Sequence, residues 1–173
     1  ITPSNLNNKI IEEAQNKIEK ACQKLGLTNG PIHAEFKVSN NEIFLIEINP
    51  RMIGGLCSRC LSFGLFKQSL EELILLSFST GKFKQIELLS NYVGVLMLPV
   101  PKNGKFRSIN YHEIMKIEHV SSVDITVSKN SQINMPPNGE KYLGFVFSQG
   151  ENKTVVMQAL KTALKIAEPV IDS

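Results

Sequence analysis

Several features that would direct a sequence to a membrane, to nucleic acid or to an oxidising compartment are scarce in this chain of 173 residues. Its three cysteines cannot all pair internally, and an odd count without a secretory signal is typical of a reducing compartment, so we expect a cytoplasmic protein. No apolar run approaches the ~20 residues that a membrane-spanning helix needs. Lysine and arginine exceed acidic residues by 19 − 16 = 3 without forming a dense cluster, which argues against nucleic acid as a partner.

What the chain does contain is the composition of a folded globular protein, with 42% hydrophobic and 20% charged residues. Its length allows one ordinary domain or two small ones. The first residue is Ile1, and helix-like sequence follows almost at once. We therefore expect the chain to be an excised piece of a longer protein.

Sequence patterns predict two compact α+β units, about residues 1–89 and 90–173. In the first unit, apolar side chains repeat at helical spacing over residues 5–25. Gly26 follows, where a helix commonly ends in a left-handed cap. A strand-like run begins at about Tyr92, near the expected start of the second unit.

Local signals predict most of the remaining elements. Ser69 and Glu72 have the spacing of a capping box, which predicts a second helix that ends near Gly81. In the second unit, the pattern predicts strands over residues 92–99, 120–127 and 141–147, a Pro-Pro-Asn-Gly turn at 136–139, and a helix over 154–167 that Pro169 closes.

A β-hairpin is predicted between the first two helices. Two strand-like runs, residues 32–38 and 43–48, flank an asparagine-rich turn at 39–42. If the loop has three residues, Glu35 lies directly opposite Glu47, because side chains alternate along a strand. A shift of the register by one residue would move the two glutamates apart.

Two opposed carboxylates repel each other, and a protein usually keeps such a pair because a cation sits between them. Glu35, Glu47 and Asn49 supply hard oxygen ligands, which suit Mg²⁺ or Mn²⁺ better than zinc. Arg51 follows two residues after Asn49, and its planar guanidinium could hold a phosphate or a carboxylate. The pattern is therefore consistent with a metal and phosphate site.

A second interpretation is that the two glutamates are solvated on an exposed hairpin face, with Lys37 as a partner. Residues 43–48 are apolar on both faces apart from Glu47, so we expect this strand to be buried, and a buried carboxylate needs a partner. His33 shares the face of Glu35 and could orient a ligand or touch substrate, but we expect it to be a satisfied structural histidine.

Other residues are given weaker interpretations. Gly54 and Gly55 either let the backbone approach a substrate or form a simple flexible turn. Cys57 and Cys60 have the C-x-x-C spacing of a redox pair or half a zinc site, but incidental thiols are the expected reading. Arg59, on the same loop, either contacts substrate or is a surface arginine.

Two runs of this region, from Gly30 to Phe36 and from Leu45 to Arg51, resemble the end of the ATP-grasp fold. Biotin carboxylases, carbamoyl-phosphate synthetases and carboxylate–amine ligases share this pattern. The second Glu follows the first by twelve residues, with Asn two and Arg four residues later, which matches the biotin carboxylase form. The resemblance implies an α+β fold: the C-terminal part of an ATP-grasp fold (an antiparallel sheet with flanking helices), followed by a small α+β unit.

The resemblance also implies roles for individual residues. In the family, the two Glu and the Asn bind the Mg²⁺ ions that bridge the phosphates of ATP, and the Arg contacts the reacting substrate or acyl phosphate. By position, Glu35, Glu47 and Asn49 would bind the metal and the ATP cofactor, and Arg51 would be catalytic as an anion clamp.

The second unit adds a narrower resemblance. Residues 94–101 and 142–150 are similar to the C-terminal region of L-amino-acid ligases, which join amino acids using ATP. This implies a carboxylate–amine ligase that forms an amide bond, in a dipeptide for example, through an acyl phosphate. Its substrates would be a small carboxylate and an amine, both of them amino acids.

In this family, the Gly-rich phosphate loop, two nucleotide-binding lysines and the adenine pocket come from sequence upstream of this region. We therefore expect an N-terminal ATP-grasp portion as partner, no activity of the piece alone, and an exposed surface that could also support a homo-oligomer. Two alternatives remain open: an enzyme that activates bicarbonate, like biotin carboxylase or carbamoyl-phosphate synthetase, and a non-catalytic binding module derived from ATP-grasp.

Overall fold

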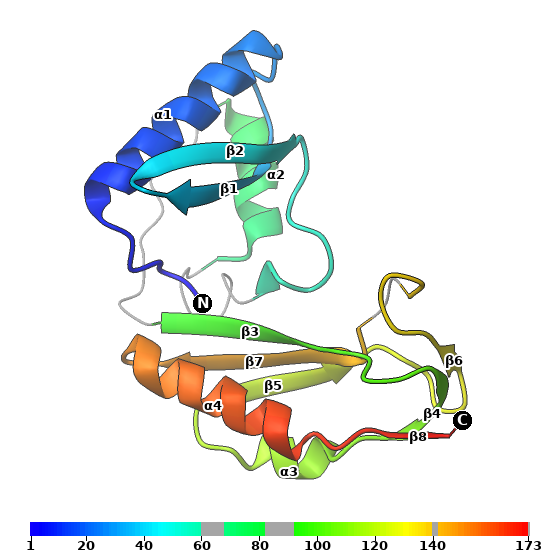
Figure 1. Ribbon diagram of the computed structural model, residues 1–173. Helices are drawn as coiled ribbons and strands as arrows, with labels where there is room; N and C mark the ends of the chain where they lie inside the picture. The colour runs from blue at the N-terminus through cyan, green and yellow to red at the C-terminus, as the bar shows by residue number, and fades with distance from the viewer. Residues whose placement is uncertain (60–67, 82–91, 140–141, 173) are drawn as a thin grey trace. The chain divides into compact units, whose positions relative to one another are not determined.

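The computed structural model describes residues 1–59, 68–81, 92–139 and 142–172 (Figure 1). These residues form two compact units. We call residues 4–59 and 68–81 the hairpin unit, and residues 1–3 together with the described part of 92–172 the C-terminal unit. The boundary expected between residues 89 and 90 lies outside the described residues, so the domain assignment stays a prediction. None of the described helices is both long and apolar enough to cross a membrane.

Helix α1 opens the hairpin unit, and local sequence sets both of its ends. The Asn7 side chain accepts a hydrogen bond from the backbone N–H of Lys9 (2.9 Å) and caps the first turn. At the other end, Gly26 has a φ of 71°, and the Leu27 N–H donates to the Cys22 carbonyl oxygen (2.9 Å), as in a Schellman motif. The predicted stop at Gly26 is confirmed. The elements of this unit are α1 (Asn8–Lys24), β1 (His33–Ser39), β2 (Glu42–Asn49) and α2 (Leu70–Thr80).

The hairpin turn is tighter than the sequence analysis assumed. Ser39 pairs with Glu42, so the loop has only two residues, Asn40 and Asn41, with φ angles of 49° and 60°. Positive φ at both central residues is what a type I′ turn requires, and its twist matches that of the flanking strands. The three-residue loop was therefore wrong.

A β-bulge nevertheless restores the predicted pairing at the far end of the hairpin. The register shifts between Glu35 and Phe36: Phe36 pairs with Leu45, whereas Glu35 pairs with Glu47, so Ile46 is the extra residue. Without the bulge, the two-residue loop would place Ile46 opposite Glu35. The predicted opposition of Glu35 and Glu47 is thus confirmed, although the loop on which it rested was wrong.

The bulge also changes which side chains of β2 share a face. Ile43 now lies on the face opposite to Glu47; it is buried, and its carbonyl oxygen accepts a hydrogen bond from Lys17 Nζ of α1 (2.9 Å). Phe44 and Ile46 are 52% and 64% exposed. The expectation that this strand is buried on both faces is therefore wrong: among the described residues α1 packs against β2, and Phe44 and Ile46 stay exposed.

Helix α2 begins as the capping box predicts. The Ser69 hydroxyl accepts a hydrogen bond from the Glu72 N–H (3.1 Å). The helix ends at Thr80, and Gly81 follows in the left-handed region with a φ of 64°, which confirms the predicted stop.

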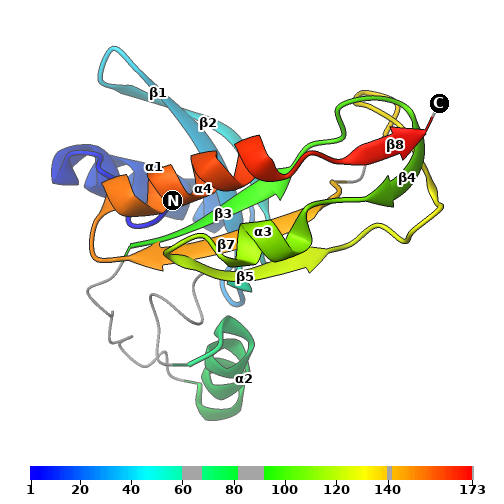
Figure 2. The ribbon, with the colours of Figure 1, turned by 90° about the horizontal axis from the view of Figure 1, so that it is seen from below.

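The C-terminal unit is built around an antiparallel sheet in the order β3-β7-β5, with α4 along one face over β3 and β7 (Figures 1 and 2). A second sheet has the order β6-β4-β8. Side chains between α4 and the first sheet, among them Val146, Val156 and Ala163, are fully buried and form the core. The elements are β3 (Tyr92–Leu98), β4 (Gly104–Ser108), α3 (Tyr111–Met115), β5 (Val120–Ile125), β6 (Gln132–Ile133), β7 (Gly144–Gly150), α4 (Lys153–Ile166) and β8 (Val170–Asp172).

The longer elements of this unit were predicted and the shorter ones were not. The strands expected over residues 92–99 and 120–127 and the helix over 154–167 correspond to β3, β5 and α4. The strand expected over 141–147 is β7 and runs further, to Gly150, while residue 141 lies outside the described residues. The sequence analysis missed β4, α3, β6 and β8, none of which exceeds five residues.

We predict that the turn residue Asn41 contributes to the stability of the hairpin. Asn41→Val should lower the free energy of unfolding by about 1–2 kcal/mol, because a β-branched side chain is strained in the left-handed region. Asn41→Gly is the matched control and should retain or slightly raise stability. Urea unfolding of the three proteins measures the effect, and equal stability of the Val and Gly variants would contradict the turn geometry.

Candidate metal centre

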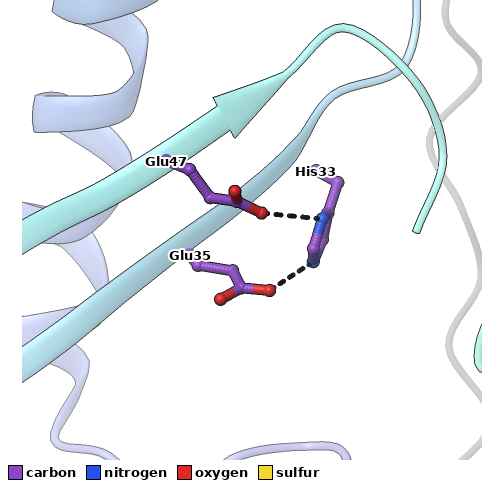
Figure 3. A group of neighbouring side chains, drawn as sticks. All are labelled: His33, Glu35 and Glu47. Carbon is purple, nitrogen blue, oxygen red and sulfur yellow. Dashed lines mark ion pairs between the residues drawn. The ribbon is translucent and has the colours of Figure 1, made fainter. Parts of the chain in front are cut away.

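Two cross-strand pairs, separated by the pair of Ala34 and Ile48, place four polar side chains on one face of the hairpin. His33 of β1 pairs with Asn49 of β2, and Glu35 pairs with Glu47. The side chains of His33, Glu35 and Glu47 converge, and the imidazole ring lies beside the two carboxylates with one nitrogen toward each (Figure 3). All of these residues belong to the hairpin unit.

The distances within this group are short but leave room for an ion. His33 Nε2 lies 3.7 Å from Glu35 Oε1, and His33 Nδ1 lies 4.0 Å from Glu47 Oε1. One ligand atom of each of these three residues lies within 4.8 Å of the others. Asn49 Nδ2 donates a hydrogen bond of 2.7 Å to Glu47 Oε1 and holds that carboxylate in place. We call His33, Glu35, Glu47 and Asn49 the hairpin cluster.

The cluster is open on one side and covered on the other. The side chains of Glu35 and Glu47 are 53% and 47% exposed, whereas that of His33 is only 17% exposed. His33 Nδ1 is fully buried and has no hydrogen-bond partner in the described part of the chain. A buried nitrogen without a partner is costly, and an ion or water that the cluster binds would satisfy it. The expectation of a satisfied structural histidine is therefore wrong for this nitrogen.

The residues predicted for the metal site are thus together, but Arg51 is not part of the group. Its Nη1 donates to the carbonyl oxygen of Met52 (2.8 Å), and its backbone N–H donates to that of Asn49 (2.8 Å). Arg51 forms no ion pair with either glutamate in the described residues. The side chain is exposed, so its guanidinium has further donors to offer.

The two glycines after Arg51 differ in what they require. A Cβ at Gly54 would lie 3.7 Å from Arg51 Nη1, an ordinary contact that does not demand glycine. Gly55 has a φ of 66°, which favours glycine, so this position forms a turn.

Cys57 lies on the same loop as these glycines and is half-buried. Burial raises the pKa of the Cys57 thiol, which keeps it in the less reactive protonated form at neutral pH. Cys60, its expected partner in a C-x-x-C pair, lies outside the described residues. The interpretation of these cysteines as incidental thiols stays a prediction.

Residues 1–60 match the family model of the ATP-grasp domain, and this segment includes the whole hairpin cluster. The match covers about the first third of the chain. The resemblance of the two hairpin runs to the ATP-grasp superfamily is confirmed. No protein of curated function matches the sequence.

Solved structures extend the ATP-grasp fold to nearly the whole chain. L-amino acid ligase from Bacillus licheniformis matches 99% of this chain with 18% identity and a TM-score of 0.84. N5-carboxyaminoimidazole ribonucleotide synthetase from Thermotoga maritima matches 99% with 18% identity and a TM-score of 0.73. Biotin carboxylase from Campylobacter jejuni, in its β,γ-ATP complex, matches 98% with 17% identity and a TM-score of 0.61. The α+β, ATP-grasp fold class is confirmed.

This chain is shorter than the solved structures that it matches. It covers 43% of the L-amino acid ligase, 45% of the synthetase and 38% of the biotin carboxylase. It thus spans less than half the length of these solved structures.

The sequence analysis did not include His33 among the metal ligands. The signal was present: His33 shares a strand face with Glu35, and the register that opposes the glutamates also opposes His33 and Asn49. The burial of Nδ1 was not readable from the sequence, because it depends on how the surrounding chain covers the ring.

We predict that the opposed glutamates destabilise the metal-free protein and that Mg²⁺ reverses this. Glu35→Gln should raise the free energy of unfolding in metal-free buffer by about 0.2–1 kcal/mol, because it removes one of two facing charges. The variant should also lose the rise in Tm that Mg²⁺ gives the wild type, since the ion stabilises only a protein that binds it. Glu42→Gln, on the same hairpin opposite Ser39, is the matched control. An equal Mg²⁺ response of wild type and Glu35→Gln would contradict the assignment.

Proposed function

We propose that the chain supplies the metal and phosphate site of an ATP-dependent carboxylate–amine ligase. The observation that carries this proposal is the hairpin cluster: two carboxylates held face to face, an amide beside them and a histidine nitrogen without a partner. This arrangement raises the energy of the protein unless a cation occupies it. The intact protein, and not this chain alone, would carry the activity.

The residues fit a divalent cation. Glu35 and Glu47 offer carboxylate oxygens on the exposed side of the cluster, where phosphate groups of a nucleotide could complete the coordination. Asn49 orients Glu47 through its amide N–H and keeps its own carbonyl oxygen for a further bond. When bound, the metal supplies positive charge that offsets the negative charge on the transferring phosphoryl group.

The proposed reaction has two steps. A carboxylate oxygen of the first substrate attacks the γ-phosphorus of ATP; the bond to the bridging oxygen breaks, and ADP leaves with its electron pair. The amine of the second substrate then attacks the carbonyl carbon of the acyl phosphate. An amide forms, phosphate leaves and the amine loses a proton. The exposed Arg51 guanidinium holds the substrate carboxylate or the acyl phosphate.

Amino acids are the substrates that we favour. Residues 94–101 and 142–150 resemble the C-terminal region of L-amino-acid ligases, and the solved structure named L-amino acid ligase has a TM-score of 0.84, against 0.61 for the biotin carboxylase. Both likenesses support the proposal without deciding it. Bicarbonate remains the alternative substrate, and a non-catalytic module the alternative outside catalysis.

The decisive experiment measures phosphate release from Mg-ATP by the intact protein over a panel of amino acids, with and without bicarbonate. Stimulation by particular amino acids is expected. Glu47→Gln should lower turnover at least about 100-fold, because the charge that develops on the phosphates loses its compensation. Circular dichroism should show an unchanged fold, and Glu42→Gln should keep wild-type turnover. Activity with bicarbonate alone would favour the carboxylase alternative, and no release under any condition would leave only the non-catalytic module.

Arg51 should act on the substrate and not on the metal. Arg51→Lys keeps the positive charge but loses the planar fork, so kcat/KM for the carboxylate substrate should fall about tenfold to a hundredfold. Direct Mg²⁺ binding should stay as in the wild type. A variant whose loss is confined to Mg²⁺ affinity would contradict the role of anion clamp.

A further inference from the structure

His33 is placed as a metal ligand would be, and its placement is otherwise unexplained. Its two ring nitrogens face different carboxylates, at 3.7 Å from Glu35 and 4.0 Å from Glu47. Both distances exceed the range of a hydrogen bond, so the ring bonds to neither carboxylate. Its Nδ1 is buried without a partner. A structural histidine would normally donate or accept at this atom.

The spacing of the ligand atoms suits an ion that lies between them. Around a cation with bonds of about 2.1 Å, neighbouring ligand atoms lie about 3 Å apart and opposite ones about 4.2 Å apart. The ligand atoms of His33, Glu35 and Glu47 all lie within 4.8 Å of one another. Small side-chain rotations of the two half-exposed glutamates would bring the three atoms to bonding distance.

The identity of the third ligand bears on which metal the site prefers. Mg²⁺ favours oxygen ligands and keeps much of its water, whereas Mn²⁺ accepts carboxylate oxygens and an imidazole nitrogen together. We infer that His33 is a direct metal ligand and that it gives this site a preference for Mn²⁺ over Mg²⁺. This inference rests on the proposed metal site and deepens it by naming the ion and a ligand.

The test measures metal binding by the intact protein, with no need for turnover. Mn²⁺ titration followed by electron paramagnetic resonance, with Mg²⁺ as competitor, gives the ratio of the two dissociation constants. His33→Gln should weaken Mn²⁺ binding on the order of tenfold or more while changing Mg²⁺ binding less, so the ratio moves toward one. His112→Gln, a histidine at the start of α3 in the C-terminal unit, is the matched control and should leave the ratio unchanged.

A second measurement on the wild type needs no variant and so does not depend on how well His33→Gln folds. Electron spin echo modulation of bound Mn²⁺ should show coupling to a directly bound ¹⁴N nucleus. Absence of that coupling, or an unchanged metal ratio in a folded His33→Gln protein, would overturn the role of His33. If Glu47→Gln still abolishes metal binding in that case, the proposed metal site stands. If Glu47→Gln binds both ions like the wild type, the metal site itself is overturned, and His33 with it.

Discussion

Two carboxylates that face each other across a β-ladder repel, and the hairpin of this chain holds Glu35 and Glu47 in that arrangement. Other features of the site depend on this one constraint. Asn49 hydrogen-bonds Glu47, and the ring of His33 faces both carboxylates. A solvated pair would need none of this support, since half-exposed carboxylates could rotate apart. The proposed cation between them would account for the convergence of these neighbours on the pair.

The constraint is imposed by backbone geometry at two places. The turn at Asn40 and Asn41 sets one register, and the bulge opposite Glu35 shifts it by one residue. Either feature alone would leave Glu35 opposite an apolar side chain, because a shift of one residue turns a strand's side chains to the other face. Bulges commonly re-aim side chains at functional sites, and the insertion of Ile46 does so here. The exposure of Ile46 is a consequence of that bulge.

Signals that act over a few residues were readable from the sequence. The left-handed cap at Gly26 and the capping box at Ser69 are such signals, and α1 ends and α2 begins where these residues indicate. The short strands β4, β6 and β8 were missed, because their pairing joins segments far apart in the chain and leaves little local pattern. The pairing of the glutamates was reached through a loop of the wrong length. Its agreement with the structure therefore reflects the bulge and not the reasoning about the turn.

The exposure of β2 shows that predicted residues can lie together although the physical reason given for them is wrong. The sequence argument was that an apolar strand buries Glu47 and that a buried carboxylate needs a partner, yet this side chain is 47% exposed. The need for a partner lies instead at His33 Nδ1, which is buried and unsatisfied. The desolvated group of the cluster is thus a nitrogen, while its charged oxygens remain accessible. In the proposed metal site, His33 would be the covered ligand, and the half-exposed Glu35 and Glu47 would be the adjustable ones. Such a site can accept phosphate oxygens from solvent without reorganising its histidine.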